Sequence, residues 1–493
     1  MDSNPNRART VILALAAIVL SSAMFFFGTG MRPIWWLTWL ATLPVLLIAP
    51  RVPAFFAFGI AALAWFAGTL NMWRYLRHIL VLPDNPHAGP LVMPLGVAIG
   101  VLIVPSGIFG LAVLLSRSFT RRGALWRAAL ALPTVWVTYE YLTAVFSPHS
   151  TFGNLAYTQM GFLPMLQVAS VTGVSGITFC LFLLPSSIAA SLAGCERPQQ
   201  KRMRAGAIGT FYLIVMLFGC ARLHFTPKAE HSVAVGLAAS DLPRNLRIEE
   251  PEEKGRLLRD YLSNVKSLAA QGAQVIVIPE KLSVVVDPET EEIDTLFKEA
   301  ANADKTRYVI GVLHVTKDAK LNEARMYSPD SATVLTYEKH HMLPAFESKL
   351  RPGTTRTLIS QPSGLWGIAI CKDMDFPSLS REYGRDGIGL LLVPAWDFSD
   401  DGWLHNRMAV MRGVESGFSI ARTAKEGLLT VSDDRGRLLA EQNSASAPFA
   451  SIVANAPVRN NRTFYMRFGD WFAWVNIALL VGLIGSRRLN TDA

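Results

Sequence analysis

Long apolar segments fill most of the first 225 residues, and few charged residues interrupt them. Because a helix of about 20 apolar residues spans a bilayer, this pattern predicts seven transmembrane helices before residue 225 and an eighth near the C-terminus. They are expected at residues 11–29, 34–50, 53–72, 91–116, 124–146, 170–194, 205–222 and 470–486. A cleaved signal peptide is the alternative for the first segment, but the apolar segments that follow it favour a retained anchor.

After residue 225, short apolar runs alternate with amphipathic stretches. Strands are expected at residues 232–239, 275–278, 308–315 and 389–393, helices at 249–271 and 404–417, and a hairpin at 428–431 and 437–440. The first helix has one apolar face, formed by Leu257, Leu258, Tyr261, Leu262, Val265 and Leu268. About 240 residues suffice for one large α/β core. We therefore predict a helical membrane domain at 1–224, a mixed α/β domain at 225–465, and the eighth helix with a short tail at 466–493.

Lysine and arginine in the loops between the predicted helices indicate the orientation in the membrane. With the N-terminus inside, the inner side carries Arg7, Arg9, Arg51, Arg117, Arg121, Arg122, Arg197, Lys201, Arg202, Arg204, Arg487 and Arg488, and the outer loops carry Arg32, Arg74 and Arg77. This predicts both termini in the cytoplasm and the α/β domain outside it. The net charge of +9 then reflects topology and anionic headgroups, so we expect no nucleic-acid partner.

Three polar residues of the α/β domain stand at the ends of apolar runs. Glu280, Lys339 and Cys371 follow or close the runs at residues 275–279, 333–337 and 367–370. Alone, each has an ordinary explanation, since such a cysteine is most often a small buried hydrophobe and a charged residue there is usually solvated. Together they indicate a Glu-Lys-Cys triad, in which the carboxylate deprotonates the thiol and the ammonium holds the oxyanion. The sequence therefore predicts acyl transfer through a Cys thioester.

Cys371 is also the single cysteine of the predicted α/β domain, because Cys180, Cys195 and Cys220 lie in or beside predicted membrane helices. Outside the cytoplasm a structural cysteine is normally paired in a disulfide. A solitary one favours a reactive thiol.

These residues resemble the carbon–nitrogen hydrolase (nitrilase) superfamily, and within it the bacterial apolipoprotein N-acyltransferases. The matching stretches are residues 277–280 (Val-Ile-Pro-Glu), 339–347, 369–371, 393–397, the helix at 408–416 with its continuation at 420–424, and the uncharged loop at 150–159. The resemblance implies a four-layer α-β-β-α sandwich beside a multi-pass membrane domain. It also implies a bacterial inner-membrane enzyme with a periplasmic catalytic domain and no metal or organic cofactor.

Substrate-binding or supporting roles are expected for four residues in or beside these stretches, Glu347, Lys372, Asp373 and Trp396. Glu347 is expected to orient the lysine, position substrate or relay a proton, with a helix-capping or surface role as the alternative. Cys371-Lys372-Asp373 departs from the Cys-Tyr-Glu of those acyltransferases. Lys372 either lowers the pKa of the thiol or reshapes the acceptor pocket, and Asp373 keeps the charge one methylene shorter. The loop at 238–243 also lacks their Gln-Gly-Asn pattern.

The membrane domain contains two further features. The loop at 150–159 either lines a lipid entry to the thiol or is a plain connection. Glu140 falls in the fifth predicted helix, where an ionisable group is usually paired or functional.

The reaction predicted by the resemblance has two halves. Cys371, activated by Glu280, attacks an ester carbonyl of a membrane phospholipid while Lys339 stabilises the oxyanion. Glu280 then deprotonates the acceptor, expected to be the N-terminal amine of a diacylglyceryl-cysteine lipoprotein or another amine. The alternatives are a membrane-tethered amidase, in which water resolves the thioester, and a non-catalytic lipid- or protein-binding relative.

Overall fold

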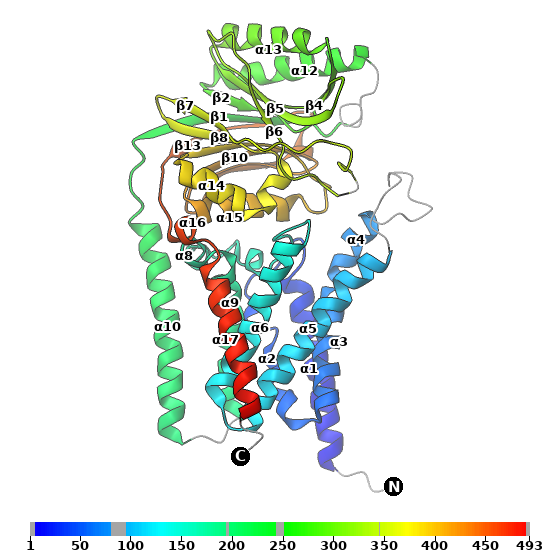
Figure 1. Ribbon diagram of the computed structural model, residues 1–493, viewed down its shortest axis with the longest axis vertical. Coiled ribbons are helices and arrows are strands. Elements are labelled where there is room, and N and C mark those ends of the chain that lie inside the picture. Colours follow the sequence, from blue (N-terminus) through cyan, green and yellow to red (C-terminus); the bar gives the residue numbers. More distant parts are fainter. Residues whose placement is uncertain (1–4, 80–94, 194–196, 243–250, 345, 490–493) are drawn as a thin grey trace. The chain divides into compact units, whose positions relative to one another are not determined.

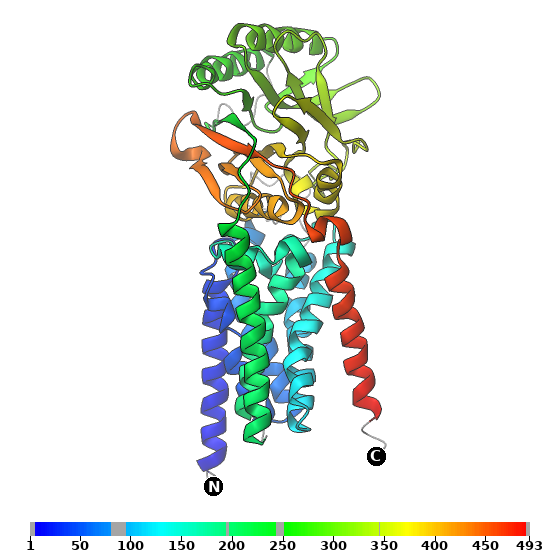
Figure 2. The same ribbon diagram turned by 90° about the vertical axis from the view of Figure 1, so that its left-hand side faces the viewer.

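The structure is a computed structural model that describes residues 5–79, 95–193, 197–242, 251–344 and 346–489. The chain divides into two compact units, drawn in Figures 1 and 2. The helical unit comprises residues 1–147, 153–224 and 470–493, and the α/β unit comprises residues 148–152 and 225–469. The sequence did not predict that residues 148–152 pack with the α/β unit. Cys195 and the start of the helix expected at 249–271 lie outside the described residues.

The helical unit is built from apolar helices of different lengths. They are α1 (Pro5–Gly28), η1 (Leu37–Trp39), α2 (Leu43–Ile48), η2 (Ala49–Arg51), α3 (Ala54–Thr69), η3 (Leu70–Met72), α4 (Trp73–Ile79), α5 (Leu95–Arg121), α6 (Leu125–Phe146), η4 (Leu155–Gln159), α7 (Leu163–Leu166), α8 (Ala169–Thr172), α9 (Val174–Ala193), α10 (Pro198–His224) and α17 (Trp471–Leu489). Helix α3 packs against α1 and α5, and α6 packs against α5, α9 and α17.

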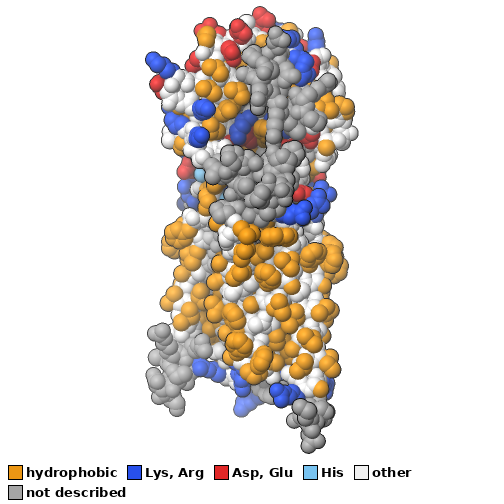
Figure 3. Space-filling view, turned by 90° about the vertical axis from the view of Figure 1, so that its right-hand side faces the viewer, with side chains coloured by type: hydrophobic (Ala, Val, Ile, Leu, Met, Phe, Trp, Pro, Cys, Tyr) orange, Lys and Arg blue, Asp and Glu red, His pale blue; other side chains and the backbone are white. Residues whose placement is uncertain are grey.

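Among the described residues, five helices are long and apolar enough to cross a membrane. They lie at Arg7–Gly28, Ala54–Arg77, Leu95–Arg121, Val174–Ala193 and Pro198–His224. Figure 3 shows hydrophobic side chains over most of the visible surface of this unit, a surface that favours lipid over water. Helices α6 and α17 form where two further spans were expected. By length and apolar composition, however, neither meets the criterion that the five helices meet. The total number of spans therefore stays a prediction.

One expected span has a different structure, because residues 34–50 do not form a single long helix. The chain there forms the short pieces η1, α2 and η2 in succession. Pro44 and Pro50 each stand in the first turn of a new piece, the helical position where the missing N–H of proline costs least. The prolines thus explain why the apolar segment is interrupted.

Glu140 on α6 is paired within the helical unit. Its carboxylate accepts hydrogen bonds from Asn154 Nδ2, Leu155 N and Thr178 Oγ1, each at 2.8 Å. A carboxylate in an apolar setting needs such donors. Glu140 was expected to be either paired or functional, and the structure shows that it is paired.

The α/β unit contains two sheets. The first sheet has the strand order β13-β1-β2-β4-β5-β6, with β3 also paired to β4, and the second has the order β12-β11-β10-β9-β8-β7. The strands of the first sheet are β1 (His231–Ala239), β2 (Val275–Val277), β3 (Ser283–Val286), β4 (Arg307–Val315), β5 (Lys320–Tyr327), β6 (Leu335–Glu338) and β13 (Ala450–Val458). Those of the second are β7 (Thr357–Gln361), β8 (Gly364–Ile368), β9 (Leu390–Trp396), β10 (Ser419–Lys425), β11 (Leu428–Ser432) and β12 (Leu438–Asn443).

Helices cover the outer faces of both sheets, as Figure 1 shows. They are α12 (Pro251–Ala270) and α13 (Thr290–Asp304) on the first sheet, and α14 (Pro377–Asp386) and α15 (Gly402–Ser416) on the second, followed by α16 (Phe464–Phe468). The apolar face expected for α12 packs on the first sheet, where Leu257, Tyr261 and Val265 are fully buried. Side chains from both sheets form one core between them. The expected α-β-β-α sandwich is confirmed.

Residues 420–424, for which the sequence predicted no secondary structure, belong to a strand that follows the helix expected at 404–417. Helix α15 ends at Ser416, because Gly417 adopts a φ of 84° and closes the helix in the left-handed conformation. The following residues form β10, which is buried along its whole length and pairs in parallel with β9.

Candidate active site

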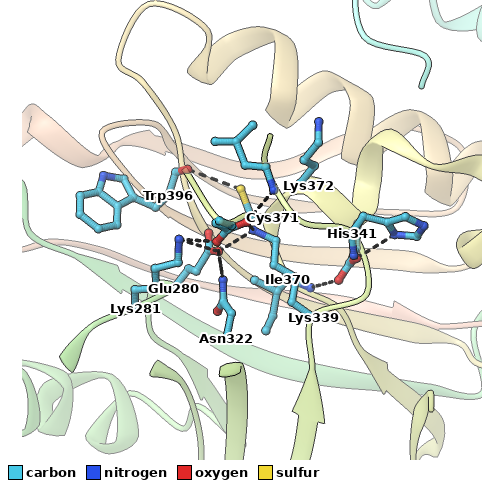
Figure 4. Close-up of polar contacts among 12 residues, drawn as sticks. Glu280, Lys281, Asn322, Lys339, His341, Ile370, Cys371, Lys372 and Trp396 are labelled. Carbon is cyan, nitrogen blue, oxygen red and sulfur yellow. Dashed lines mark hydrogen bonds and ion pairs between the residues drawn. The ribbon is translucent and has the colours of Figure 1, made fainter. Parts of the chain in front are cut away.

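Glu280, Lys339 and Cys371 come together at one end of the two sheets, as Figure 4 shows. Glu280 lies in the turn between β2 and β3, Lys339 directly follows β6, and Cys371 follows β8. The Lys339 ammonium donates to Glu280 Oε1 at 2.8 Å. Both side chains are almost completely buried, with 2% and 1% of their surface exposed. The expected clustering at strand ends is therefore present in the structure.

A second carboxylate holds the same lysine. Lys339 Nζ donates to Glu347 Oε2 at 2.8 Å, and Asn322 Nδ2 joins the two carboxylates at 2.6 Å from Glu280 and 2.8 Å from Glu347. Burial by itself would lower the pKa of Lys339, but the charges of Glu280 and Glu347 outweigh it and hold that pKa well above its usual value. The lysine therefore remains a cation that can stabilise a negative oxygen.

Glu347 is ionised, and its carboxylate has three partners besides Asn322. Its carboxylate accepts from the backbone N of Leu343 at 2.8 Å and pairs with both Lys339 and Lys281. Burial opposes the charge, but the two lysines outweigh burial and lower the pKa of Glu347 to about 2. This geometry fits orientation of the lysine among the expected roles, and it leaves Glu347 without a proton to relay near neutral pH.

Cys371 stands on a strained turn. It adopts a φ of 43° between the end of β8 and the short helix η5 (Cys371–Asp375). Left-handed conformations of non-glycine residues are costly and concentrate at functional sites. The residue is partly exposed, and its Sγ lies 3.4 Å from the carbonyl oxygen of Trp396. Loss of water, followed by the charge of Glu280, raises the pKa of the thiol well above its ordinary value. The resting thiol is therefore protonated and needs a base.

Asp373 connects the turn that carries Cys371 to the loop that follows Lys339. Its Oδ2 accepts from Ile370 N at 3.0 Å and from Tyr337 Oη at 2.7 Å. Its Oδ1 accepts from the backbone N of His340 at 3.2 Å and of His341 at 2.9 Å. A single buried carboxylate thus fixes residues on both sides of the site, which is a supporting arrangement.

Lys372 points away from the carboxylate cluster (Figure 4). Its Nζ lies 2.9 Å from Asp375 Oδ2 and 3.3 Å from His149 Nδ1. The ammonium is thereby neutralised by its own turn. Since the pKa of the Cys371 thiol is raised, the geometry gives no support to the expectation that Lys372 favours a thiolate.

Trp396 is the last residue of β9, and its backbone carbonyl faces Cys371. Besides the carbonyl contact with Cys371, its indole Nε1 donates to Glu426 Oε2 at 2.8 Å. The ammonium of Lys425 lies over the face of the ring, 3.6 Å from its centroid.

Sequence reasoning missed three side chains of the site, namely Asn322, Lys281 and Lys425. Asn322 lies on β5, a strand without an apolar run to reveal it, and Lys425 ends β10, a strand that the sequence did not predict. Only Lys281 carried a usable signal, since it directly follows Glu280. No group of three or more metal-binding side chains occurs within the described part of the chain.

Two family models match the chain in succession. The model for the apolipoprotein N-acyltransferase N-terminal domain matches residues 14–187, and the carbon-nitrogen hydrolase model matches residues 238–462. Among curated proteins, the apolipoprotein N-acyltransferase of Geobacter metallireducens is 27% identical, with 97% of this chain and 96% of that protein covered. The enzyme of the same name from Gloeobacter violaceus is 24% identical, with 98% and 95% covered.

About half of the chain is also similar to solved structures of other proteins. An amidase from Nesterenkonia sp. matches with a TM-score of 0.41 and 18% identity, covering 50% of this chain and 95% of that one. Nit3 from Saccharomyces cerevisiae, a member of branch 10 of the nitrilase superfamily, matches with a TM-score of 0.39 and 20% identity, covering 46% and 92%.

Proposed function

The chain belongs to the apolipoprotein N-acyltransferase family, and we propose that it moves an acyl chain from a membrane phospholipid, through a thioester on Cys371, to the N-terminal amine of a diacylglyceryl-cysteine lipoprotein. The observation that carries the mechanism is the position of Lys339. Its ammonium is held between Glu280 and Glu347, in the cluster that also contains Cys371, a partly exposed residue.

In the first half-reaction Glu280 takes the proton of the Cys371 thiol while Sγ attacks the ester carbonyl of the phospholipid. Lys339 and the backbone N–H of Lys372 stabilise the tetrahedral oxyanion. The C–O bond of the ester then breaks, and Glu280 returns the proton to the departing lysolipid oxygen. The products are a Cys371 thioester and a lysophospholipid.

In the second half-reaction the acceptor amine attacks the thioester carbonyl. Glu280 removes a proton from the attacking nitrogen, the C–S bond breaks, and the proton returns to the sulfur. The amide product leaves, and the thiol of Cys371 is restored. The raised pKa of the thiol fits this order of steps, because the thiol stays protonated at rest and Glu280 deprotonates it only when a substrate carbonyl is present.

The surroundings of the site support a membrane-bound acyltransferase. The chain contains several helices suited to a bilayer, and the family acts on lipids and lipoproteins. We place it in the bacterial inner membrane with both termini in the cytoplasm and the α/β unit in the periplasm, on the basis of the lysine and arginine distribution.

The amidase alternative shares the first half-reaction and differs only in the use of water in the second. Family membership favours transfer to an amine over hydrolysis. The intact cluster of Glu280, Lys339 and Cys371 argues against a purely binding role, which would not need a nucleophile.

The deciding experiment is intact-protein mass spectrometry of the detergent-purified protein, before and after addition of phospholipid. We expect an added acyl mass that hydroxylamine removes and that Cys371→Ala lacks. A diacylated lipopeptide should discharge the adduct much faster than water does. Absence of the adduct in the wild type would refute the proposal, and discharge by water alone would indicate the amidase.

A further inference from the structure

Lys425 is a buried amine beside the active site. It ends β10 and lies opposite Trp396 of β9 in parallel register. Its Nζ donates to the backbone oxygen of Lys281 at 3.2 Å and lies 3.6 Å from the centroid of the Trp396 ring. Only 1% of the residue is exposed. One side chain thus contacts the residue after the proposed base and the residue whose carbonyl faces the thiol.

The two segments that Lys425 contacts belong to different sheets. Lys281 lies between β2 and β3 of the first sheet, whereas Trp396 and Lys425 end strands of the second sheet. Glu280 N donates to Ala395 O at 3.3 Å across the same gap. The separation of base and nucleophile therefore depends on contacts that join the sheets at this end.

The Trp396 ring is fixed from two directions. Glu426 accepts from the edge of the indole at 2.8 Å, while the Lys425 ammonium lies over the face, where the electron density of the ring attracts a cation. Displacement of the ring would also displace the Trp396 carbonyl, 3.4 Å from Cys371 Sγ.

The ammonium of Lys425 has different electrostatic surroundings from that of Lys339. Among the described residues Lys425 forms no ion pair, whereas Lys339 contacts two carboxylates. Burial lowers the pKa of Lys425 to about 7. The carboxylates of Glu280, Glu426 and Asp241 oppose this shift and the ammonium of Lys281 adds to it. The cation over the ring is therefore present below neutral pH and is lost above it.

We propose that Lys425 is a positioning residue of the acyl-transfer site, which sets the placement of Glu280 relative to Cys371 by joining the Lys281 carbonyl to the Trp396 ring. The inference rests on the proposed function for its description of the reaction. Lys425 itself acts through its two neighbours and need not contact the substrate.

The test compares Lys425→Met with the wild type in the full-length, detergent-purified protein. At saturating phospholipid, thioester formation should slow about 100-fold, because displacements near 1 Å have effects of that order, while the KM for phospholipid changes little. Lys317→Met is the matched control, since Lys317 is exposed in the turn between β4 and β5, and it should behave as the wild type. A wild-type rate for Lys425→Met would overturn the proposal.

A second variant separates positioning from simple structural support. Lys425→Arg keeps a permanent cation, so the ratio of the wild-type rate to the Lys425→Arg rate should fall as the pH rises through about 7. A ratio independent of pH, together with a slow Lys425→Met, would mean structural support only and would also overturn the proposal. If Lys425→Met does not fold, Lys425→Gln replaces it, since it keeps a donor for the Lys281 carbonyl but carries no charge.

Failure of this inference can be distinguished from failure of the proposed function. Alkylation of Cys371 by iodoacetamide, followed by mass spectrometry, reports on the thiol without a lipid substrate. If the wild type forms no thioester, the proposed function fails, yet altered alkylation in Lys425→Met would still support the positioning role. If the wild type forms the thioester and both rates are unchanged in Lys425→Met, only the role of Lys425 fails.

Discussion

Lys339 and Glu347 form a buried ion pair, with 2.8 Å between Nζ and Oε2. Because the same ammonium also donates to Glu280, Glu347 helps to fix where the cation lies beside Glu280, the proposed base. A buried charge that loses its partner is strongly unfavourable. Glu347 is therefore tied to both the stability and the chemistry of the site.

Replacement of Glu347 by glutamine should slow thioester formation by about 100-fold or more, because loss of a correctly placed oxyanion donor has effects of that size. The ion pair is lost and Lys339 can move toward Glu280. Intact-protein mass spectrometry at timed intervals after phospholipid addition measures the rate. Glu347→Asp keeps the charge and should retain more activity than Glu347→Gln. Equal rates in Glu347→Gln and the wild type would contradict the assigned role.

His405 provides a prediction for stability against pH. Its ring lies 3.4 Å from Asp375 Oδ1 and 3.2 Å from Asp401 Oδ2. Burial would lower its pKa, but the two carboxylates outweigh burial and raise the pKa to about 10. Because the folded pKa lies above the unfolded value of about 6.5, this stabilisation is complete below pH 6.5 and is lost as the pH rises through 10.

The midpoint of thermal unfolding in detergent should therefore fall for the wild type between pH 6.5 and pH 10. His405→Gln, which has no proton to lose, should be less stable at pH 6.5 and show a smaller decline over the same range. Parallel declines in the two proteins would show that His405 does not contribute to the pH dependence.

Lys372→Met tests one of the two roles expected for this lysine, that it lowers the pKa of the Cys371 thiol. Because the ammonium is paired with Asp375 at 2.9 Å, we expect the pH midpoint of Cys371 alkylation by iodoacetamide to remain where it is in the wild type. A midpoint shifted to higher pH in Lys372→Met would instead show that Lys372 lowers the pKa of the thiol. Lys317→Met serves as the exposed lysine control.

The structural role of Lys372 is tested by unfolding. Lys372→Met leaves Asp375 without this partner, so the free energy of unfolding should fall. In the double variant Lys372→Met, Asp375→Asn, the loss should be smaller than the sum of the two single losses by about 0.5–3 kcal/mol, the range found for residues in contact. Additive losses would mean that the pair is not coupled.

The sequence predicted the triad because each member ends an apolar run. In layered α/β proteins such positions are neighbours at one edge of a sheet, so local pattern and tertiary position agree. Asn322 was missed because its strand, β5, is polar along much of its length. Its contacts with Glu280 and Glu347 arise only when three separate segments meet.

Strand β10 was missed for a related reason. The run Ile-Ala-Arg-Thr-Ala has no distinct strand alternation, and central strands buried on both faces lack such a pattern. The helix before β10 was expected to end at residue 417, and Gly417 does end it, since a glycine just after an amphipathic helix commonly does so. The polar Lys425 at the end of that strand became a site residue only through the register of β10 with β9.

Gly311 on β4 allows the position of the base to be tested without change to any reacting group. A Cβ at this position would lie 2.4 Å from Glu280 Cα, 2.7 Å from Pro279 O and 2.9 Å from Lys281 N. These are backbone atoms, so Gly311→Ala must push the turn that carries Glu280 away from β4. Overpacking of this kind costs about 1–3 kcal/mol of stability, and a shift of the base near 1 Å should slow thioester formation about 100-fold. Gly255→Ala on α12 is the control, because its Cβ would meet only the end of the Arg259 side chain. A folded Gly311→Ala protein with a wild-type rate would show that the reaction does not depend on the exact position of Glu280, and would count against its role as the base.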